Sequence, residues 1–465
     1  MIISHLLPFF ESLMLYFSPM VEPTIVPRSA HAISRRDVDP DALKVLYRLH
    51  EHNYIAYLVG GSVRDLLLGR RPKDFDIGTS AHPHQVKKLF RNCWIIGRRF
   101  RLAHVKFGTK TIEVATFRRL VEPSGPTPES EAATVRPADV VGPGQPLAPD
   151  EDEAPRRRRV EDHLIHRDNT YGTPEEDAFR RDFTVNALFY DIGTFSIIDY
   201  VGGLGDLEAR LIRCIGDPEV RFLEDPVRML RAVVLAARLE FSIDEPVLDA
   251  IATHRHEIAR SAPARLLEEY YKILRSGHAE QAFRQLRATG LLREITPELT
   301  QAPDPLWRSI AALDRYRAGF SSAPDTLTNA ILAGTLLHPL GLIGRRRFHA
   351  DATERRIELG LLPIARRDVE RLQQILAIQP RLLDLNAPAR SQRALLHRSV
   401  LDEALTWLEI HGGDPRVVEH WRALRATPVE RTHPPAEPGH PHAPADFPRR
   451  RRRRRRRRRV SPQQT

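Results

Sequence analysis

The spacing of apolar residues changes along the chain and predicts two kinds of structure. Residues 41–52 carry apolar side chains at helical spacing, and short alternating or continuous apolar runs follow. We expect a helix at 63–68 and strands around 75–77 and at 57–59, 94–96, 104–107, 111–117, 184–190 and 197–200. This mixture predicts an α/β head of about 200 residues.

Strand signals nearly vanish beyond Pro218, where helical spacing takes over. We expect helices at 229–239, 264–274, 279–286, 326–337 and 369–378, so the second half of the chain is predicted to be all-helical. Two segments show neither the helical nor the strand-like spacing of apolar residues. Residues 121–160 contain eight prolines and read as a flexible insertion in the head. Residues 427–448 are rich in proline and histidine, which favours a linker over the alternative, a metal-binding tract.

The positive charge of the chain is concentrated at one end. The net charge is +11, and an unbroken run of eleven arginines begins at Arg449 and ends at Arg459, so the remaining residues sum to zero. Such a run cannot fold, because its charges repel one another, but it attracts the phosphates of nucleic acid. We expect a disordered tail that tethers RNA, with a merely solubilising end as the alternative.

Other features narrow the class of protein. The first 20 residues are apolar, but Pro8 and Glu11 interrupt them, and they lack both the basic start and the cleavage site of a signal peptide. We interpret residues 1–23 as a disordered or misassigned start, with membrane contact as the alternative. Two cysteines in the whole chain argue against a disulfide framework and a structural zinc site, and predict a reducing compartment, the cytoplasm.

Asp74 and Asp76 are the first candidates for chemistry. At this spacing on a strand, both carboxylates share one face, and Phe75 and Ile77 share the other. Two convergent carboxylates repel unless a cation lies between them, and Mg²⁺ prefers such oxygen ligands. A surface pair without a metal is the common alternative for this motif alone.

Two nearby segments strengthen the metal interpretation. Gly60 and Gly61 stand between a predicted strand and a predicted helix, where glycine lets the backbone approach a triphosphate, and Arg64 adds a charge. Glu113 is a lone carboxylate in an otherwise apolar predicted strand and a candidate third ligand. An ordinary strand-to-helix turn and a solvent-facing glutamate are the alternatives.

These segments belong to a series of blocks that resembles a known family. GGSVRD at 60–65, PKDFDI at 72–77, IEVATFR at 112–118, RRDFTVNA at 180–187 and EDPVRMLR at 224–231 follow one another in the order found in class II nucleotidyltransferases. This family includes tRNA CCA-adding enzymes and bacterial poly(A) polymerases. Residues 67–76 and 97–105, the lead-in at 25–35 and the basic end look like the poly(A) polymerase branch. The resemblance covers about residues 24–295, with Ser62 in place of the commoner third glycine.

The resemblance implies an α+β fold. We expect a polymerase-β-like nucleotidyltransferase head with a mixed sheet at 24–205, a helical neck for base and RNA binding at 206–295, a helical body at 296–426, and the linker and tail at 427–465. It also implies template-independent addition of AMP from ATP to RNA 3′ ends, with release of pyrophosphate. The added tail is expected to promote RNA decay, with RNA-decay proteins as partners.

The resemblance also assigns roles to residues. Asp74 and Asp76 would hold two Mg²⁺ ions, and Glu113 or Asp182 would supply the third carboxylate; for Asp182 the alternative is a salt bridge with Arg180 or Arg181. Asp225 and Arg228 would offer their side chains to the edge of the base, and Arg231 continues that face. An ion pair between Asp225 and Arg228 within one helix is the alternative. Residues 263–269 resemble the family's block that braces this helix.

Two other functions compete with polyadenylation. A CCA-adding enzyme would use the same metals but accept CTP as well as ATP. An RNA-binding protein that has lost catalysis would need none of the acidic blocks, so the intact pair of aspartates argues against it.

Overall fold

The computed structural model describes residues 22–97, 101–119, 170–343, 357–412 and 414–426. Three predicted segments therefore lie outside the described residues: most of the start at 1–23, the insertion at 121–160, and the linker and tail at 427–465 with the arginine run. Among the residues described, no helix is both long and apolar enough to cross a lipid bilayer.

An eight-stranded mixed sheet forms the head, in the order β1-β8-β7-β2-β3-β6-β5-β4. Pairing is antiparallel throughout, except that β3 and β6 run parallel, with Ile77 opposite Val114. The strands are β1 (Thr24–Val26), β2 (Ala56–Val59), β3 (Ile77–Thr79), β4 (Cys93–Ile96), β5 (Leu102–Phe107), β6 (Lys110–Thr116), β7 (Leu188–Asp191) and β8 (Ser196–Asp199).

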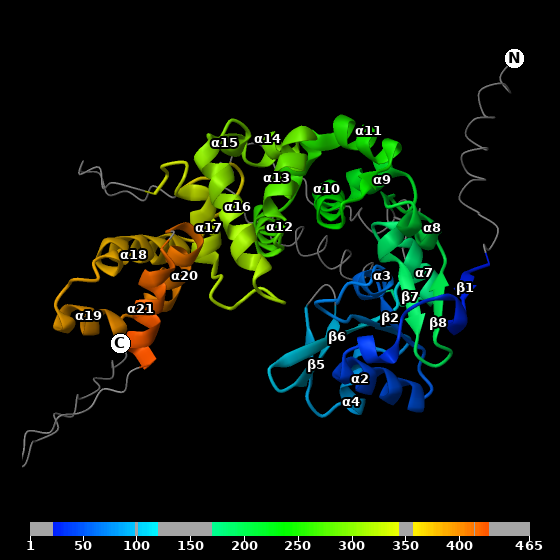
Figure 1. Ribbon diagram of the computed structural model, residues 1–465. Coiled ribbons are helices and arrows are strands. Elements are labelled where there is room, and N and C mark those ends of the chain that lie inside the picture. Colours follow the sequence, from blue (N-terminus) through cyan, green and yellow to red (C-terminus); the bar gives the residue numbers. More distant parts are fainter. Residues whose placement is uncertain (1–21, 98–100, 120–169, 344–356, 413, 427–465) are drawn as a thin grey trace, which may run out of the picture.

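Helices α2 (Pro40–Glu51) and α4 (Pro83–Leu89) cover one face of this sheet (Figure 1). Asp39 caps α2 by accepting hydrogen bonds from the amides of Asp41 and Ala42, and the apolar stripe of α2 is buried. Ile77, Val105 and Val114 meet this stripe in the main core. Burial of alternate strand residues therefore fixes which side chains face away from the helices.

The opposite face of the sheet is covered over only part of its width. Val59, Phe117, Phe189 and Ile198 form a second core there, together with residues of α7 (Pro174–Phe179) and Ile215. These strand residues come from β2, β7 and β8 and from the end of β6. The outer strands β4 and β5 contribute nothing to this second core.

Backbone pairs join the two chain ends that flank residues 120–169. Arg118 forms a β-bridge with Tyr171, and the amide of Arg119 donates to the carbonyl of Thr170 at 3.1 Å. The amide of Gly172 donates to the carbonyl of Phe117 at 2.9 Å. The described residues on either side of 120–169 therefore lie side by side.

Helices continue from the head to the far end of the molecule (Figure 1). Helix α8 lies next to the sheet, α9 to α11 and then α12 to α17 follow, and α18 to α21 form the far end. They are α8 (Gly203–Glu208), α9 (Pro218–Glu224), α10 (Val227–Leu239), α11 (Glu245–His254), α12 (Pro263–Arg275), α13 (Ala279–Ala288), α14 (Leu291–Ile295), α15 (Pro297–Thr300), α16 (Asp304–Ala318), α17 (Asn329–Leu337), α18 (Arg366–Leu383), α19 (Ala389–Leu396), α20 (Leu401–His411) and α21 (Pro415–Ala426). Strands β9 (Leu211–Ile212) and β10 (Ser242–Ile243) form a separate parallel pair.

The α+β architecture is as predicted, a mixed sheet followed by helices. One strand prediction was wrong in part: residues 184–186 form a short 3₁₀ helix, and β7 begins only at Leu188. Apolar residues dominate this segment, and periodicity cannot separate a buried turn from a buried strand there.

Candidate active site

The double glycine forms the turn between β2 and α3 (Gly61–Leu67). Gly60 has φ 68°, a left-handed value that favours glycine. A Cβ on Gly60 would lie 3.0 Å from Nη1 of Arg181 and 3.2 Å from the carbonyl oxygen of Asn186. Conformation and close packing both require glycine, so the sequence motif has a geometric cause.

Asp74 and Asp76 precede β3, which begins at Ile77, so the expectation that both lie within the strand was wrong. The amide of Val59 still donates to the carbonyl of Asp76 at 3.1 Å, which holds Asp76 against the end of β2. Phe75 and Ile77 are buried and Asp76 is exposed, so the predicted alternation of faces holds. The side chain of Asp74 is 73% exposed.

The parallel pairing of β3 with β6 brings Glu113 beside Asp76. Because Ile77 is opposite Val114 and both are buried, the preceding residues, Asp76 and Glu113, face the other side of the sheet. The side chain of Glu113 is 50% exposed, and its Oε1 lies 3.6 Å from Nε2 of His104. The structure therefore places two of the predicted metal ligands, Asp76 and Glu113, side by side on the face that α2 and α4 leave free.

The electrostatics of Asp76 reflect this crowding. Its pKa is raised from 3.8 to about 6, first because surrounding protein displaces water and then because the charges of Glu113 and Asp74 repel its own. The charge of Arg181 opposes the shift. A cation bound among these carboxylates would offset their mutual repulsion and so stabilise the ionised form of Asp76.

The donor set suits Mg²⁺, since exposed carboxylate oxygens that repel one another are its preferred protein ligands. Within the described ranges, however, no three His, Cys, Asp or Glu side chains are gathered closely enough to form a ready metal site. Asp74 would have to turn toward Asp76 to share an ion.

Two arginines lie behind the glycine turn. Arg64, predicted to contact the nucleotide, is 2% exposed and donates to Oδ1 of Asp65 at 2.6 Å and to Oδ1 of Asn186. Its Nη2 is 3.3 Å from the position of a Cβ on Gly61, so its charge lies directly beneath the turn. Arg181 was not predicted as a site residue, although the paired arginines of the RRDFTVNA block were a visible signal.

Asp177 accounts for the orientation of Arg181. Both Arg180 and Arg181 donate to this buried carboxylate, at 2.5 and 2.8 Å. Burial disfavours the ionised carboxyl, but the two guanidinium groups outweigh it and hold the pKa of Asp177 below its usual range.

Asp182 is a partner of the helical neck and does not lie with the other carboxylates. Its Oδ2 is 2.7 Å from Nη2 of Arg231 on α10, and its Oδ1 accepts from the amide of Phe183. Burial disfavours its charge, but Arg231 outweighs that penalty and lowers the pKa of Asp182. The salt bridge that was the alternative role for Asp182 exists, but with Arg231 instead of Arg180 or Arg181.

Asp225 and Arg228 flank the start of α10. Asp225 ends α9 and makes two hydrogen bonds with Arg265 of α12, at 2.7 and 2.8 Å. Arg228 donates to Glu224 at 2.9 Å. The intrahelical pair of Asp225 with Arg228 was therefore wrong. Within residues 263–269, Arg265 makes the contact with Asp225.

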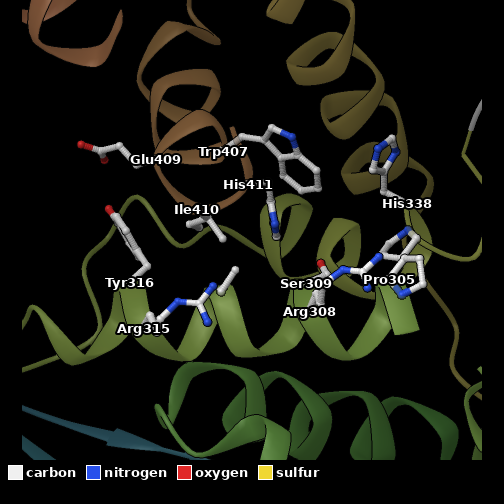
Figure 2. Close-up of a pocket in the computed structure, with 12 residues that line it drawn as sticks. Pro305, Arg308, Ser309, Arg315, Tyr316, His338, Trp407, Glu409, Ile410 and His411 are labelled. Atoms are coloured by element: carbon white, nitrogen blue, oxygen red, sulfur yellow. The ribbon is translucent and has the colours of Figure 1, made fainter. Parts of the chain in front are cut away.

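A pocket of about 820 Å³ lies elsewhere, between α16, the end of α17 and α20 (Figure 2). Figure 2 shows Arg308, Arg315 and Tyr316 on α16 and Trp407 and His411 on α20. None of the predicted site residues lines it.

Known proteins resemble this chain in sequence and in fold. Residues 56–213 match the family model of the poly(A) polymerase head domain, and residues 240–302 match that of the probable RNA and SrmB-binding site of polymerase A. The chain is 48% identical over 278 residues to poly(A) polymerase I of Salmonella typhimurium, covering 60% of this chain and 54% of that protein. It is 32% identical over 304 residues to the CCA-adding enzyme of Bacillus pumilus, covering 65% and 63%.

A solved structure extends the likeness into the helices. The Bacillus stearothermophilus CCA-adding enzyme, solved in complex with CTP, is 28% identical, with a TM-score of 0.54 over 83% of this chain and 82% of that one. The chain spans about half the length of the poly(A) polymerases it matches. The head-domain match, the fold and the order of the sequence blocks agree, and each shows similarity to the nucleotidyltransferases that include bacterial poly(A) polymerases and CCA-adding enzymes.

Proposed function

We propose that this chain is a polynucleotide adenylyltransferase that adds AMP from ATP to RNA 3′ ends without a template. The observation that carries the proposal is a set of three mutually repelling carboxylates, those of Asp74, Asp76 and Glu113, beside the glycine turn. Identity of 39–48% to poly(A) polymerases, against 32–34% to CCA-adding enzymes, supports adenylate as the product.

The carboxylates supply the chemical part of the mechanism. Asp74, Asp76 and Glu113 would hold two Mg²⁺ ions, which when bound lower the pKa of the RNA 3′-hydroxyl and neutralise the triphosphate. The 3′-oxygen then forms a bond to the α-phosphorus of ATP, and the bond to the leaving pyrophosphate breaks. Asp182 was the other candidate third carboxylate, but its ion pair with Arg231 supports a positioning role.

The glycine turn and the neck would hold the nucleotide. Gly60 and Gly61 leave the backbone open to the triphosphate, with the charge of Arg64 beneath them and that of Arg181 beside them. Both charges are fixed by carboxylate or amide partners, so they need not reorganise when the triphosphate binds.

Asp225 and Arg228 would select the base of the incoming nucleotide, and Arg231, on the same helix as Arg228, continues their face. Arg265 fixes the carboxylate of Asp225, and Glu224 fixes the guanidinium of Arg228. Fixed donors and acceptors discriminate between bases because a wrong base leaves them unpaired.

We further propose that the product directs RNA decay in the cytoplasm, with RNA-decay proteins as partners. Residues 240–302 would bind RNA, as their family model suggests. The arginine run from Arg449 to Arg459 would tether RNA. Both described cysteines are free and buried, which suits a reducing compartment.

A CCA-adding activity is the second candidate, favoured by the fold shared with the CTP-bound enzyme. The test is extension of a short RNA with each of the four NTPs separately, with and without Mg²⁺. We expect long tails with ATP alone. Addition of C residues from CTP followed by a single A would support the second candidate, and no metal-dependent pyrophosphate release would refute both.

A further inference from the structure

One row of side chains crosses the sheet from the carboxylates to its edge. Glu113 on β6 is directly opposite His104 on β5, and His104 is directly opposite Trp94 on β4. Residues opposite one another in antiparallel strands share a face. Trp94 therefore faces the same side as Glu113 and Asp76.

This end of the row is open to solvent. Trp94 is 49% exposed, and its neighbour on the same face, Ile96, is 50% exposed. The second core, which covers this face over β2, β7 and β8, stops at the carboxylates. An exposed tryptophan on an edge strand is a liability for solubility unless something binds there.

The spacing fits RNA. Adjacent strands lie about 4.8 Å apart, so β4 is about 10 Å from β6, a distance that one or two nucleotides span. The ammonium of Lys106, on the face shared with His104, lies 5.5 Å from the centre of the Trp94 ring. An aromatic platform with an adjacent cation is the arrangement that binds single-stranded nucleic acid, since the ring stacks on a base and the cation pairs with a phosphate.

We propose that the last nucleotides of the RNA lie along this row, with a base stacked on Trp94 and a phosphate at Lys106. The inference rests on the proposed function and adds the path by which RNA reaches the carboxylates. Trp94 binds and takes no part in the chemistry. His104, 3.6 Å from Glu113, lies between the two ends of the path.

Tryptophan fluorescence tests the stacking without requiring catalysis. Trp307, Trp407 and Trp421 are 7%, 5% and 0% exposed, so Trp94 is the exposed tryptophan of the four in the chain. Titration of the full chain with a twelve-residue oligoadenylate, without ATP, should quench the emission. The quench should disappear in Trp94→Phe and persist in the control Trp307→Phe. Equal quenching in the wild type and Trp94→Phe would overturn the proposal.

Kinetics separate binding from chemistry. Trp94→Ala should raise the KM for RNA about 5- to 100-fold, the range for loss of one base stack, with kcat and the KM for ATP unchanged. Trp94→Phe should largely restore the KM. An oligoadenylate with abasic sites in its last two positions should bind the wild type as weakly as the intact RNA binds Trp94→Ala. An unchanged KM in Trp94→Ala would refute the path. Quenching by RNA in a chain that extends no RNA would refute the proposed function and leave the path standing.

Discussion

Replacement of Asp76 by asparagine should abolish extension yet stabilise the metal-free protein at neutral pH. The pKa of this carboxyl is raised from 3.8 to about 6, so the folded state binds its proton more tightly than the unfolded state does. Ionisation therefore opposes folding: the free energy of unfolding falls as the pH rises from about 4 to about 6, and stays lower above that range. Asparagine carries no charge and escapes this penalty.

The magnitude follows from the shift. A shift of about two pKa units corresponds to at most about 3 kcal/mol. Asp76 is exposed, so solvent screening reduces the expected gain to about 1 kcal/mol. For a unit about the size of the head, this raises the Tm by about 2–4 °C.

The assay is calorimetric unfolding in EDTA at pH 3.5, 5 and 7, beside an extension assay. The gain in Tm should be absent at pH 3.5 and complete at pH 7. Asp249→Asn, an exposed site on α11, is the matched control and should change the Tm little at any pH. Millimolar Mg²⁺ should stabilise the wild type and reduce the advantage of the variant. A variant less stable than wild type at pH 7 would refute the view that the carboxylates repel one another.

Three further predictions concern other parts of the chain. Arg228→Ala should reduce the preference for ATP over the other NTPs about 5- to 100-fold while the KM for RNA stays unchanged; identical relative rates for all four NTPs would remove Arg228 from base choice. Asp182→Asn should cost about 1–3 kcal/mol of stability at pH 7 by breaking the pair with Arg231. Because the pKa of Asp182 is lowered, this loss should shrink as the pH falls below about 4, which urea unfolding at the two pH values would check. Truncation after Pro448 should weaken RNA binding and reduce its salt dependence, by about 0.7 in the log–log slope for each phosphate released, without changing the single-turnover rate at saturating RNA. Equal slopes for truncated and full-length protein would show that the arginine run does not bind RNA.

Local pattern predicted most strands of the head but missed β1, α4 and α7, and it could not predict how the strands pair. Alternation around Phe75 and Ile77 correctly placed Asp76 on the exposed face. The proximity of Glu113 to Asp76 depends on the parallel register of two strands that are distant in sequence. The sequence offered Glu113 as a candidate ligand but could not predict this register. Trp94 appeared only as part of a strand for the same reason.

Ion pairs were the least predictable feature. Arg180 and Arg181 are adjacent to Asp182 in sequence, yet they pair with Asp177, one helical turn earlier. Arg231, 49 positions beyond Asp182, is its partner because α10 packs beside the end of the head. Sequence distance favours neighbours, whereas burial selects the guanidinium group that can reach a desolvated carboxylate.

The paired backbone at Arg118–Tyr171 makes the sheet indifferent to the length of chain between them. Closing a flexible loop costs free energy that grows only with the logarithm of its length, so any flexible connection ten times longer than another costs about 2 kcal/mol more. Because the flanking residues are held together by backbone pairing, the register of β2, β3 and β6 does not depend on how many residues connect Arg118 to Tyr171. The sheet therefore provides a point at which residues can be inserted into the head. Evolution can lengthen, shorten or replace the residues between Arg118 and Tyr171 while the carboxylates stay in place.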